Sequence, residues 1–385
     1  MHKINFYPVN NGDSSQIILD NGKRILLDYR QHPSATDSSR PEIDLSATLK
    51  SDLKMANRDN FDVVAFTHAD NDHIEGSTEF FYLEHAEKYQ DKGRIKIDEL
   101  WVPAAILLES ASNDEQSEEF VILRSEARHR LKDGKGIKIF SKPQDLIDLM
   151  KTYDIGPNDR DYLIVDAGTI VDTFDLDEDG VEFFCHSPYI KHCDDGVTKE
   201  IRNSAALIFN VRFKYSSLVY DMFAVGDSTC EVLADIVNIT EFHNRNDRLE
   251  WNLFSTPHHC SYLSLAPSGE KGNKKTTPID EVQRLLNSGR KNSYIVSSSK
   301  PINNDDEAYA QIQPPHVQAK NTYLDYLANV GGRKFMVTME EPNRINPKPL
   351  KFEITAGGLS LAKAVVSGVS TAAAIAPARA GVIDE

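Results

Sequence analysis

Two histidines and two aspartates lie close together in the stretch Thr67-His68-Ala69-Asp70-Asn71-Asp72-His73. Histidine nitrogens and carboxylate oxygens both bind divalent metal ions. His68 and Asp70 are two residues apart, so in an extended segment their side chains point the same way, whereas Asp72 and His73 turn toward a second point. Such an arrangement can hold two cations about 3.5–4 Å apart, a spacing used in metal-assisted hydrolysis. The alternative is a polar loop in which these side chains only cap a helix.

The residues on either side of this stretch predict where it lies in the fold. Residues 61–66 form an apolar run that is typical of a buried strand. The polar residues from Thr67 onward indicate a loop at the C-terminal end of that strand, and a helix is expected over residues 74–81. In layered α/β folds, sites are usually built at the C-terminal edge of the strands. We therefore expect the histidines and aspartates to gather at such an edge.

This stretch resembles the His-x-His-x-Asp-His signature of the metallo-β-lactamase superfamily, with Asp70 where the superfamily usually has histidine. The form with aspartate resembles the hydrolase domain of the ComEC/Rec2 competence proteins and their soluble relatives. The resemblance implies an α/β fold, namely a four-layer αββα sandwich. It also implies a hydrolase that uses two metal ions.

Two further motifs are similar to those of the same proteins. Gly12-Asp13-Ser14 and Asp28 match the opening of the family, and the resemblance implies that Asp28 orients a ligand histidine. The alternative for Asp28 is a strand-end carboxylate in water. Gly226-Asp227-Ser228 resembles the fourth motif of the superfamily, in which the aspartate bridges the two metal ions.

The histidine pair His258-His259 resembles the fifth motif, with Cys260 in place of the usual glycine. His258 matches the ligand position, so His259 would face substrate. The third motif has no clear histidine in this chain. Asn203 or His186 would complete the first metal position, with Asn203 favoured because it closely precedes a strand.

The resemblance thus implies a complete set of site residues. His68, Asp70 and Asn203 would hold one ion, Asp72, His73 and His258 the other, and Asp227 would bridge them. The catalytic residues would be Asp72 and His259. The residues around them or in contact with substrate would be Asp28, Asp13, His316, Arg128, Arg130 and Lys132. Zinc is the expected ion. Manganese is the alternative, since the carboxylate of Asp70 is a harder ligand than the usual histidine and hard oxygen ligands suit manganese. A metal-bound hydroxide would be the nucleophile.

A basic run over residues 124–142 is the clearest candidate for a phosphate-facing patch, although a solvated helix face is the alternative. Together with the oxygen-rich ligand set, it favours a phosphodiesterase or nuclease. Hydrolysis of a small ester or lactone is a second possibility. A non-catalytic module that binds a nucleotide or a partner protein is a third, and fold alone does not decide among them.

Composition narrows the class of protein. The 385 residues carry a net charge of −16, which disfavours non-specific binding to nucleic acid or anionic membranes. We find no signal peptide and no apolar run of the ~18 residues that a membrane span needs. Four cysteines without CxxC spacing are typical of buried thiols in a reducing compartment, so a cytoplasmic location is expected.

The remaining pattern predicts the division of the chain. Residues 1–355 would form the hydrolase domain, with a helical insertion over about 84–150. Residues 356–385 would form an Ala- and Gly-rich tail, in which a short helix over 359–369 could dock on a partner. The strands expected along the domain are 4–9, 16–19, 24–27, 61–66, 95–103, 170–174, 181–185, 205–213, 218–225, 293–297, 335–339 and 350–354.

Overall fold

The computed structural model describes residues 1–109, 117–193 and 202–362. Its strands are β1 (His2–Phe6), β2 (Ser15–Ile18), β3 (Arg24–Leu27), β4 (Asn60–Ala65), β5 (Lys96–Pro103), β6 (Ile137–Phe140), β7 (Ile164–Val165), β8 (Val181–Ser187), β9 (Ile208–Tyr215), β10 (Leu218–Val225), β11 (Trp251–Ser255), β12 (Gly289–Ser297), β13 (Lys334–Val337), β14 (Leu350–Thr355) and β15 (Gly358–Leu361). Its helices are α1 (Leu45–Met55), α2 (Asn71–Ile74), α3 (Ser77–Phe80), α4 (Ala104–Leu108), α5 (Glu118–Asp133), α6 (Gln144–Lys151), α7 (Cys230–Phe242), α8 (Asp280–Asn287), α9 (Asp306–Ala310) and α10 (Val317–Asn329).

The strands form two mixed sheets. The first has the order β15-β14-β1-β2-β3-β4-β5-β6-β7 and is parallel from β3 to β7. The second has the order β13-β12-β11-β10-β9-β8 and is parallel from β10 to β13. Each sheet therefore has a run of parallel strands whose C-terminal ends share one edge, which is where loops can bring distant side chains together.

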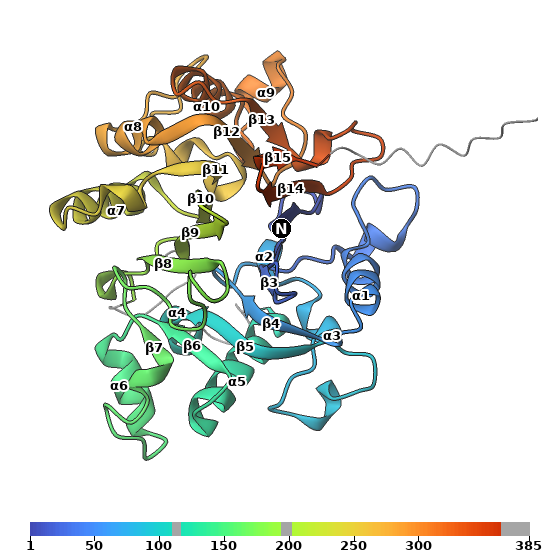
Figure 1. The fold of residues 1–385 in the computed structure, drawn as a ribbon, viewed down its shortest axis with the longest axis vertical. Coiled ribbons are helices and arrows are strands. Elements are labelled where there is room, and N and C mark those ends of the chain that lie inside the picture. Colours follow the sequence, from blue (N-terminus) through green and yellow to red (C-terminus); the bar gives the residue numbers. More distant parts are fainter. Residues whose placement is uncertain (110–116, 194–201, 363–385) are drawn as a thin grey trace, which may run out of the picture.

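Three apolar cores define the layers. Successive residues of a strand face opposite sides of its sheet, and in β4 Val63 and Ala65 join the core between the sheets, while Val64 packs with α1, α4 and α5. In β10, Met222 likewise faces the other sheet, whereas Phe223 packs with α7, α8 and α10. Figure 1 shows α5 and α6 outside the first sheet and α7, α8 and α10 outside the second. The predicted αββα sandwich is confirmed.

The segment 84–150 differs from the expected helical insertion. It contributes β5 and β6 to the parallel part of the first sheet, between β4 and β7, and only its helices α4, α5 and α6 lie outside. The parallel pairing of β5 with β4 also explains why the strand β5 is continuous and buried at its C-terminal end. This segment is therefore part of the sandwich.

Three local expectations need correction. The predicted helix over 74–81 is divided into α2 and α3, because Gly76 takes a left-handed conformation with φ 79°. Residues 170–174 form no strand beyond an isolated bridge at Ile170. Residues 358–361 pair with β14 as a strand, so the short helix predicted over 359–369 does not begin there. The rest of that helix lies outside the described residues.

Among the helices described, the structure has none with both the length and the apolar character needed to cross a membrane.

Candidate metal centre

The predicted histidines and aspartates meet where the C-terminal ends of the two sets of parallel strands face each other. The loop after β4 carries His68 and Asp70, and the short helix α2 that follows it carries Asp72 and His73. The loops after β10 and β11 carry Asp227 and the pair His258-His259. Gly226 allows this approach, since a Cβ atom there would lie only 2.7 Å from Thr67 Oγ1. A glycine fits here because the Thr67 side chain, which follows a strand of the other sheet, packs directly against the Gly226 backbone.

Asp227 lies between two groups of ligand atoms. Its Oδ2 is 4.0 Å from His68 Nε2 and 3.5 Å from His258 Nε2. Asp70 Oδ2 lies 3.8 Å from the same His68 nitrogen. We group these four side chains as a first candidate position, which we call site 1: His68, Asp70, His258 and Asp227 Oδ2.

The other oxygen of Asp227 faces a second group. Its Oδ1 is 3.3 Å from His73 Nε2 and 3.6 Å from His259 Nε2. Asp72 Oδ2 lies 3.0 Å from His259 Nε2. Asp13 is close to both rings, 3.9 Å from His73 and 3.7 Å from His259. We call this group site 2: Asp13, Asp72, His73, His259 and Asp227 Oδ1.

Hydrogen bonds to the outer ring nitrogens of His73 and His259 fix the orientation of both rings in site 2. Asp28 Oδ2 accepts from His73 Nδ1 at 2.8 Å, and it also binds the Thr67 hydroxyl at 2.7 Å. His259 Nδ1 donates to the Ser298 carbonyl at 2.9 Å. Because a carbonyl can only accept, Nδ1 carries a proton, and Nε2 is the ring nitrogen that faces the site. Such bonds hold ligand histidines in most protein metal sites.

Several buried polar atoms at this centre have no hydrogen-bond partner among the described residues. They are His68 Nε2, His73 Nε2, Asp227 Oδ1 and His258 Nδ1. Leaving a buried polar atom unpaired is costly, so native folds pair nearly all of them. Lone-pair donors that converge without partners fit divalent cations, and the mixed nitrogen and oxygen set fits zinc or manganese.

The protonation of the site follows the same electrostatics. Burial disfavours a charge on His73, but Asp28 and Asp227 outweigh it and hold the pKa of His73 well above its usual value. Burial opposes the charge on His259 too, yet Asp227 and Asp72 raise its pKa to about 9. Burial raises the pKa of Asp13 to about 6. The centre thus attracts positive charge, which metal ions would supply.

The loop that carries the histidine pair has an unusual backbone. His258, His259 and Cys260 have φ values of 48°, 52° and 68°, all in the left-handed region. Each such residue costs on the order of 1–3 kcal/mol when it is not glycine. Cys260 thus adopts the conformation for which the resembling motif uses glycine. Strain of this kind is concentrated at functional sites, where surrounding contacts maintain it.

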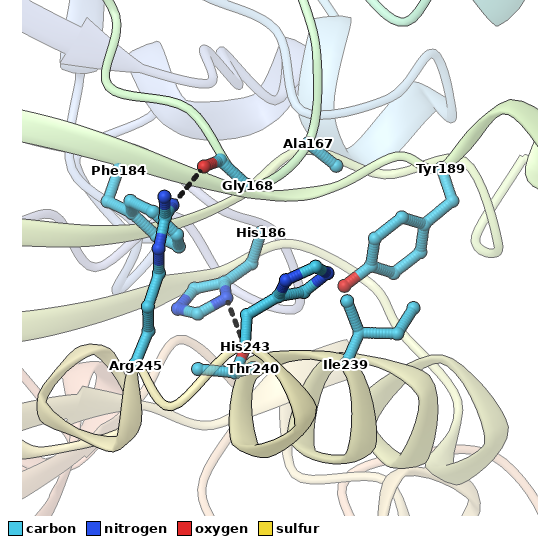
Figure 2. Close-up of a pocket in the computed structure, with 9 residues that line it drawn as sticks. All are labelled: Ala167, Gly168, Phe184, His186, Tyr189, Ile239, Thr240, His243 and Arg245. Carbon is cyan, nitrogen blue, oxygen red and sulfur yellow. Dashed lines mark hydrogen bonds between the residues drawn. The ribbon is translucent and has the colours of Figure 1, made fainter.

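The structure places the two candidates for the third motif differently. The Asn203 side-chain oxygen is buried and has no partner among the described residues, next to Arg202, which binds Asp70. His186 lies on β8 in a separate cavity of about 210 Å³ (Figure 2), where its Nε2 binds the Arg248 carbonyl at 3.0 Å. Figure 2 also shows Thr240 bonded to the same ring. His186 therefore does not reach the centre.

His316 lies behind the histidine loop. Its backbone N–H donates to the Cys260 carbonyl at 3.0 Å, and its Nδ1 accepts from the Tyr262 N–H at 3.2 Å. The other ring nitrogen binds the Ile312 carbonyl at 3.0 Å. His316 thus holds the loop in place, and its ring nitrogens are occupied by backbone groups.

The predicted phosphate-facing patch needs correction. Arg130 is 2% exposed and binds Glu126 at 2.7 Å and the carbonyls of Ile97 and Gly136. These two carbonyls lie at the N-terminal ends of β5 and β6, the opposite edge from the centre. Arg128 donates to the Leu107 carbonyl at 2.9 Å. These two arginines serve the fold, because their donors bind its backbone carbonyls.

Lys132, the third member of that patch, is exposed at the far end of α5, and its ammonium lies 4.0 Å from the centre of the Tyr153 ring. It does not belong to the metal centre either.

Three residues near the centre carried no signal in the sequence. Arg202 binds Asp70, Glu109 binds Arg202, and Ser298 orients His259. Arg202 precedes Asn203 in the chain, so the only sequence signal near it was the prediction for Asn203. Ser298 acts through its backbone carbonyl, which every residue has, and no spacing links Glu109 to the motifs.

No protein-family model and no curated protein matches the chain. Similar solved structures include unliganded yeast PDE1, at 11% identity and TM-score 0.40, covering 87% of this chain and 97% of the other. A diphosphatase from the PhnP family has 10% identity and TM-score 0.35, covering 92% and 98%. A long-form RNase Z from yeast has 13% identity and TM-score 0.39, covering 87% and 40%. Because these TM-scores are below 0.5, the fold rests on the topology described above and the site on its own geometry.

Proposed function

We propose that this chain is a hydrolase that uses two divalent metal ions, most consistent with zinc, and that it cleaves a small phosphodiester. The observation that carries this proposal is Asp227, whose two oxygens face two separate groups of histidines. A carboxylate in that place can bridge a metal pair, and metal pairs are used for displacement at phosphorus. The ComEC-like character suggested by Asp70 is part of this proposal.

The geometry supports a different ligand assignment from the one implied by the motifs. His258 belongs to site 1 with His68, and His259 belongs to site 2 with Asp72 and His73. Both histidines of the pair would then hold metal, with none left to face substrate. Asn203, whose side-chain oxygen has no partner among the residues that the structure describes, could complete site 1 or contact substrate.

Bound ions would acidify a water molecule and polarise the bond to be broken. The residues of the chain have other tasks. Asp28 and the Ser298 carbonyl keep the protons of His73 and His259 on Nδ1. Asp13 and Asp72 provide carboxylates beside the reaction centre.

The charges around the centre favour a small substrate over a nucleic acid. The aspartates Asp13, Asp28, Asp70, Asp72 and Asp227 surround it, and Arg202 is already paired with Glu109 and Asp70. Two divalent ions would leave little excess positive charge there. The predicted basic patch does not compensate, since Arg128 and Arg130 bind carbonyls of the fold. A nucleic acid would gain few phosphate contacts from these residues.

The test combines metal analysis with a choice of substrates. We expect purified protein to hold close to two divalent ions per chain and to cleave bis-(p-nitrophenyl) phosphate. DNA and RNA should be cleaved poorly, and p-nitrophenyl acetate should be cleaved at no more than its background rate. Activity on the carboxylic ester alone would replace the phosphodiesterase with an esterase or lactonase. If the purified protein binds no metal, the hydrolase proposal fails and the remaining alternative is a non-catalytic module that binds a nucleotide or a partner protein.

A further inference from the structure

Arg202 contacts the aspartate that replaces a histidine in the first motif. Its Nη1 donates to Asp70 Oδ1 at 2.8 Å and to the Ala69 carbonyl at 3.2 Å. The other oxygen of Asp70, Oδ2, lies on the side of His68, 3.8 Å from Nε2. The guanidinium therefore takes one carboxylate oxygen and leaves the other for site 1.

Arg202 is itself held in one position. Its Nε donates to Glu109 Oε2 at 2.7 Å, and its Nη2 donates to the other oxygen of the same carboxylate. The guanidinium also lies 4.9 Å from the centre of the Phe120 ring. Arg202 and Glu109 are only 7% and 1% exposed. A two-pronged arginine bond of this kind fixes orientation as well as charge.

This arrangement addresses a problem that an aspartate ligand creates. A histidine ligand offers one nitrogen, whereas a carboxylate offers two equivalent oxygens and can rotate. An unpaired arginine beside a metal position would repel the cation, but Glu109 neutralises Arg202. The pair Arg202–Glu109 thus supplies a directed hydrogen bond to Asp70 with no net charge of its own.

We propose that Arg202 is a positioning residue for site 1: it holds Asp70 with Oδ2 toward His68 and thereby sets how tightly site 1 binds its ion. The inference rests on the proposed metal-dependent function, but it concerns one of the two positions only. Site 2 has its own orienting groups, Asp28 and the Ser298 carbonyl, so it should be independent of Arg202.

The experiment replaces the pair and measures each ion separately. Arg202→Met alone would remove the cation from a buried Glu109, so the double variant Arg202→Met/Glu109→Leu is the main test. The matched control is Arg130→Met/Glu126→Leu, a buried arginine–glutamate pair at the other edge of the sheet. Metal content, stepwise metal titration and the visible absorption spectrum of the cobalt-loaded protein are recorded for the wild type and for each variant.

We expect the double variant to bind one ion as the wild type does and the other roughly 10–100-fold more weakly, as is typical when a group behind a metal ligand is removed. The cobalt spectrum should change, because one ligand set is altered. The control pair should keep both affinities and the wild-type spectrum. Arg202→Lys keeps the charge but lacks the planar guanidinium. Its affinity for the ion in site 1 should therefore lie between those of the wild type and the double variant.

The possible failures are distinct. Two wild-type affinities and an unchanged cobalt spectrum in the double variant would overturn the positioning role and leave the proposed hydrolase intact. An equal loss of affinity in the control pair would also overturn it, since the effect would then come from general loss of packing. A wild-type protein that binds no divalent ion would overturn the proposed function and this inference with it.

Discussion

Arg130 and Arg202 are both buried arginines bonded to a buried glutamate, yet they lie toward opposite ends of the parallel strands of the first sheet. Arg130 directs its remaining donors to the carbonyls of Ile97 and Gly136, at the N-terminal edge of β5 and β6. Arg202 lies at the C-terminal edge and directs one donor to Asp70. The same chemical group thus completes the fold at one edge and reaches a candidate metal ligand at the other.

The difference lies in how fully each edge is paired. Around Arg130, Glu126 binds Arg130 and His85 with both oxygens. At the C-terminal edge, buried atoms such as His68 Nε2 and Asp227 Oδ1 have no partner among the described residues. An edge with all groups paired gains stability, while an edge with converging unpaired donors has the capacity to bind an ion. Substitutions at the two edges should therefore separate stability from metal binding.

The largest effect is expected for Asp227→Asn. Loss of the shared carboxylate should remove most of the bound metal and lower phosphodiester hydrolysis by about 1,000-fold or more, because a metal pair contributes several kcal/mol to the transition state. Metal content and the rate on bis-(p-nitrophenyl) phosphate measure this. Asp221→Asn is the control: Asp221 lies within β10, the strand that leads to Asp227, and is also buried but paired with Arg212 at 2.8 Å. It should keep its metal.

The next effect separates the two histidines of the loop. His258→Ala and His259→Ala should each lose about one ion, from site 1 and site 2 respectively, because each ring faces a different oxygen of Asp227. Metal titration of both variants checks this. If His259→Ala keeps both ions and loses only rate, the assignment implied by the motifs is right and the geometric one is not.

At the other edge, Arg130→Met should affect stability alone. It leaves the buried carboxylate of Glu126 without its arginine, a change that costs about 3–5 kcal/mol. Urea unfolding should show this loss, while the number of bound ions in the folded protein stays at the wild-type value. Loss of metal from folded Arg130→Met protein would mean that the two edges are coupled.

A smaller effect is the acid sensitivity of Glu126. Burial disfavours its charge, but hydrogen bonds from His85 and the pairing with Arg130 outweigh it and lower its pKa to about 2. The unfolded chain has a pKa near 4.3 at this residue and binds the proton more readily. The stability from Glu126 is thus present above about pH 4.3 and is lost as the pH falls toward 2. Glu126→Gln should flatten the dependence of unfolding free energy on pH in that window.

The smallest effect is expected for Lys132→Glu. This residue is exposed and its ammonium contacts the Tyr153 ring, away from the centre. We expect rates on both the small diester and single-stranded DNA to stay within about twofold of the wild type, since a lone surface charge contributes little. If the rate on DNA falls markedly while the rate on the small diester does not, the prediction of a phosphate-facing patch is right for Lys132.

Local signals in the sequence were sufficient for the elements and for most ligand candidates. The apolar run before Thr67, the Gly-Asp at the end of β10 and the pair His258-His259 are each set by neighbours in the chain, so their pattern is visible without a fold. The strand β10 agrees with the range predicted for it. The strands β5 and β6 were harder to place, since a parallel partner distant in sequence decides that they lie within the sheet.

What only the tertiary structure decided is which of these residues meet and which are already occupied. Whether Arg130 faces phosphate or a carbonyl depends on Ile97 and Gly136, which no spacing relates to it. Which histidine of the pair joins His68 depends on a left-handed turn at residues 258–260 that local preference disfavours. Arg202 and Glu109 are 93 residues apart and come together only when the two sheets pack. Residue types determined the available chemistry, whereas the geometry and partners of each group arise from contacts distant in sequence.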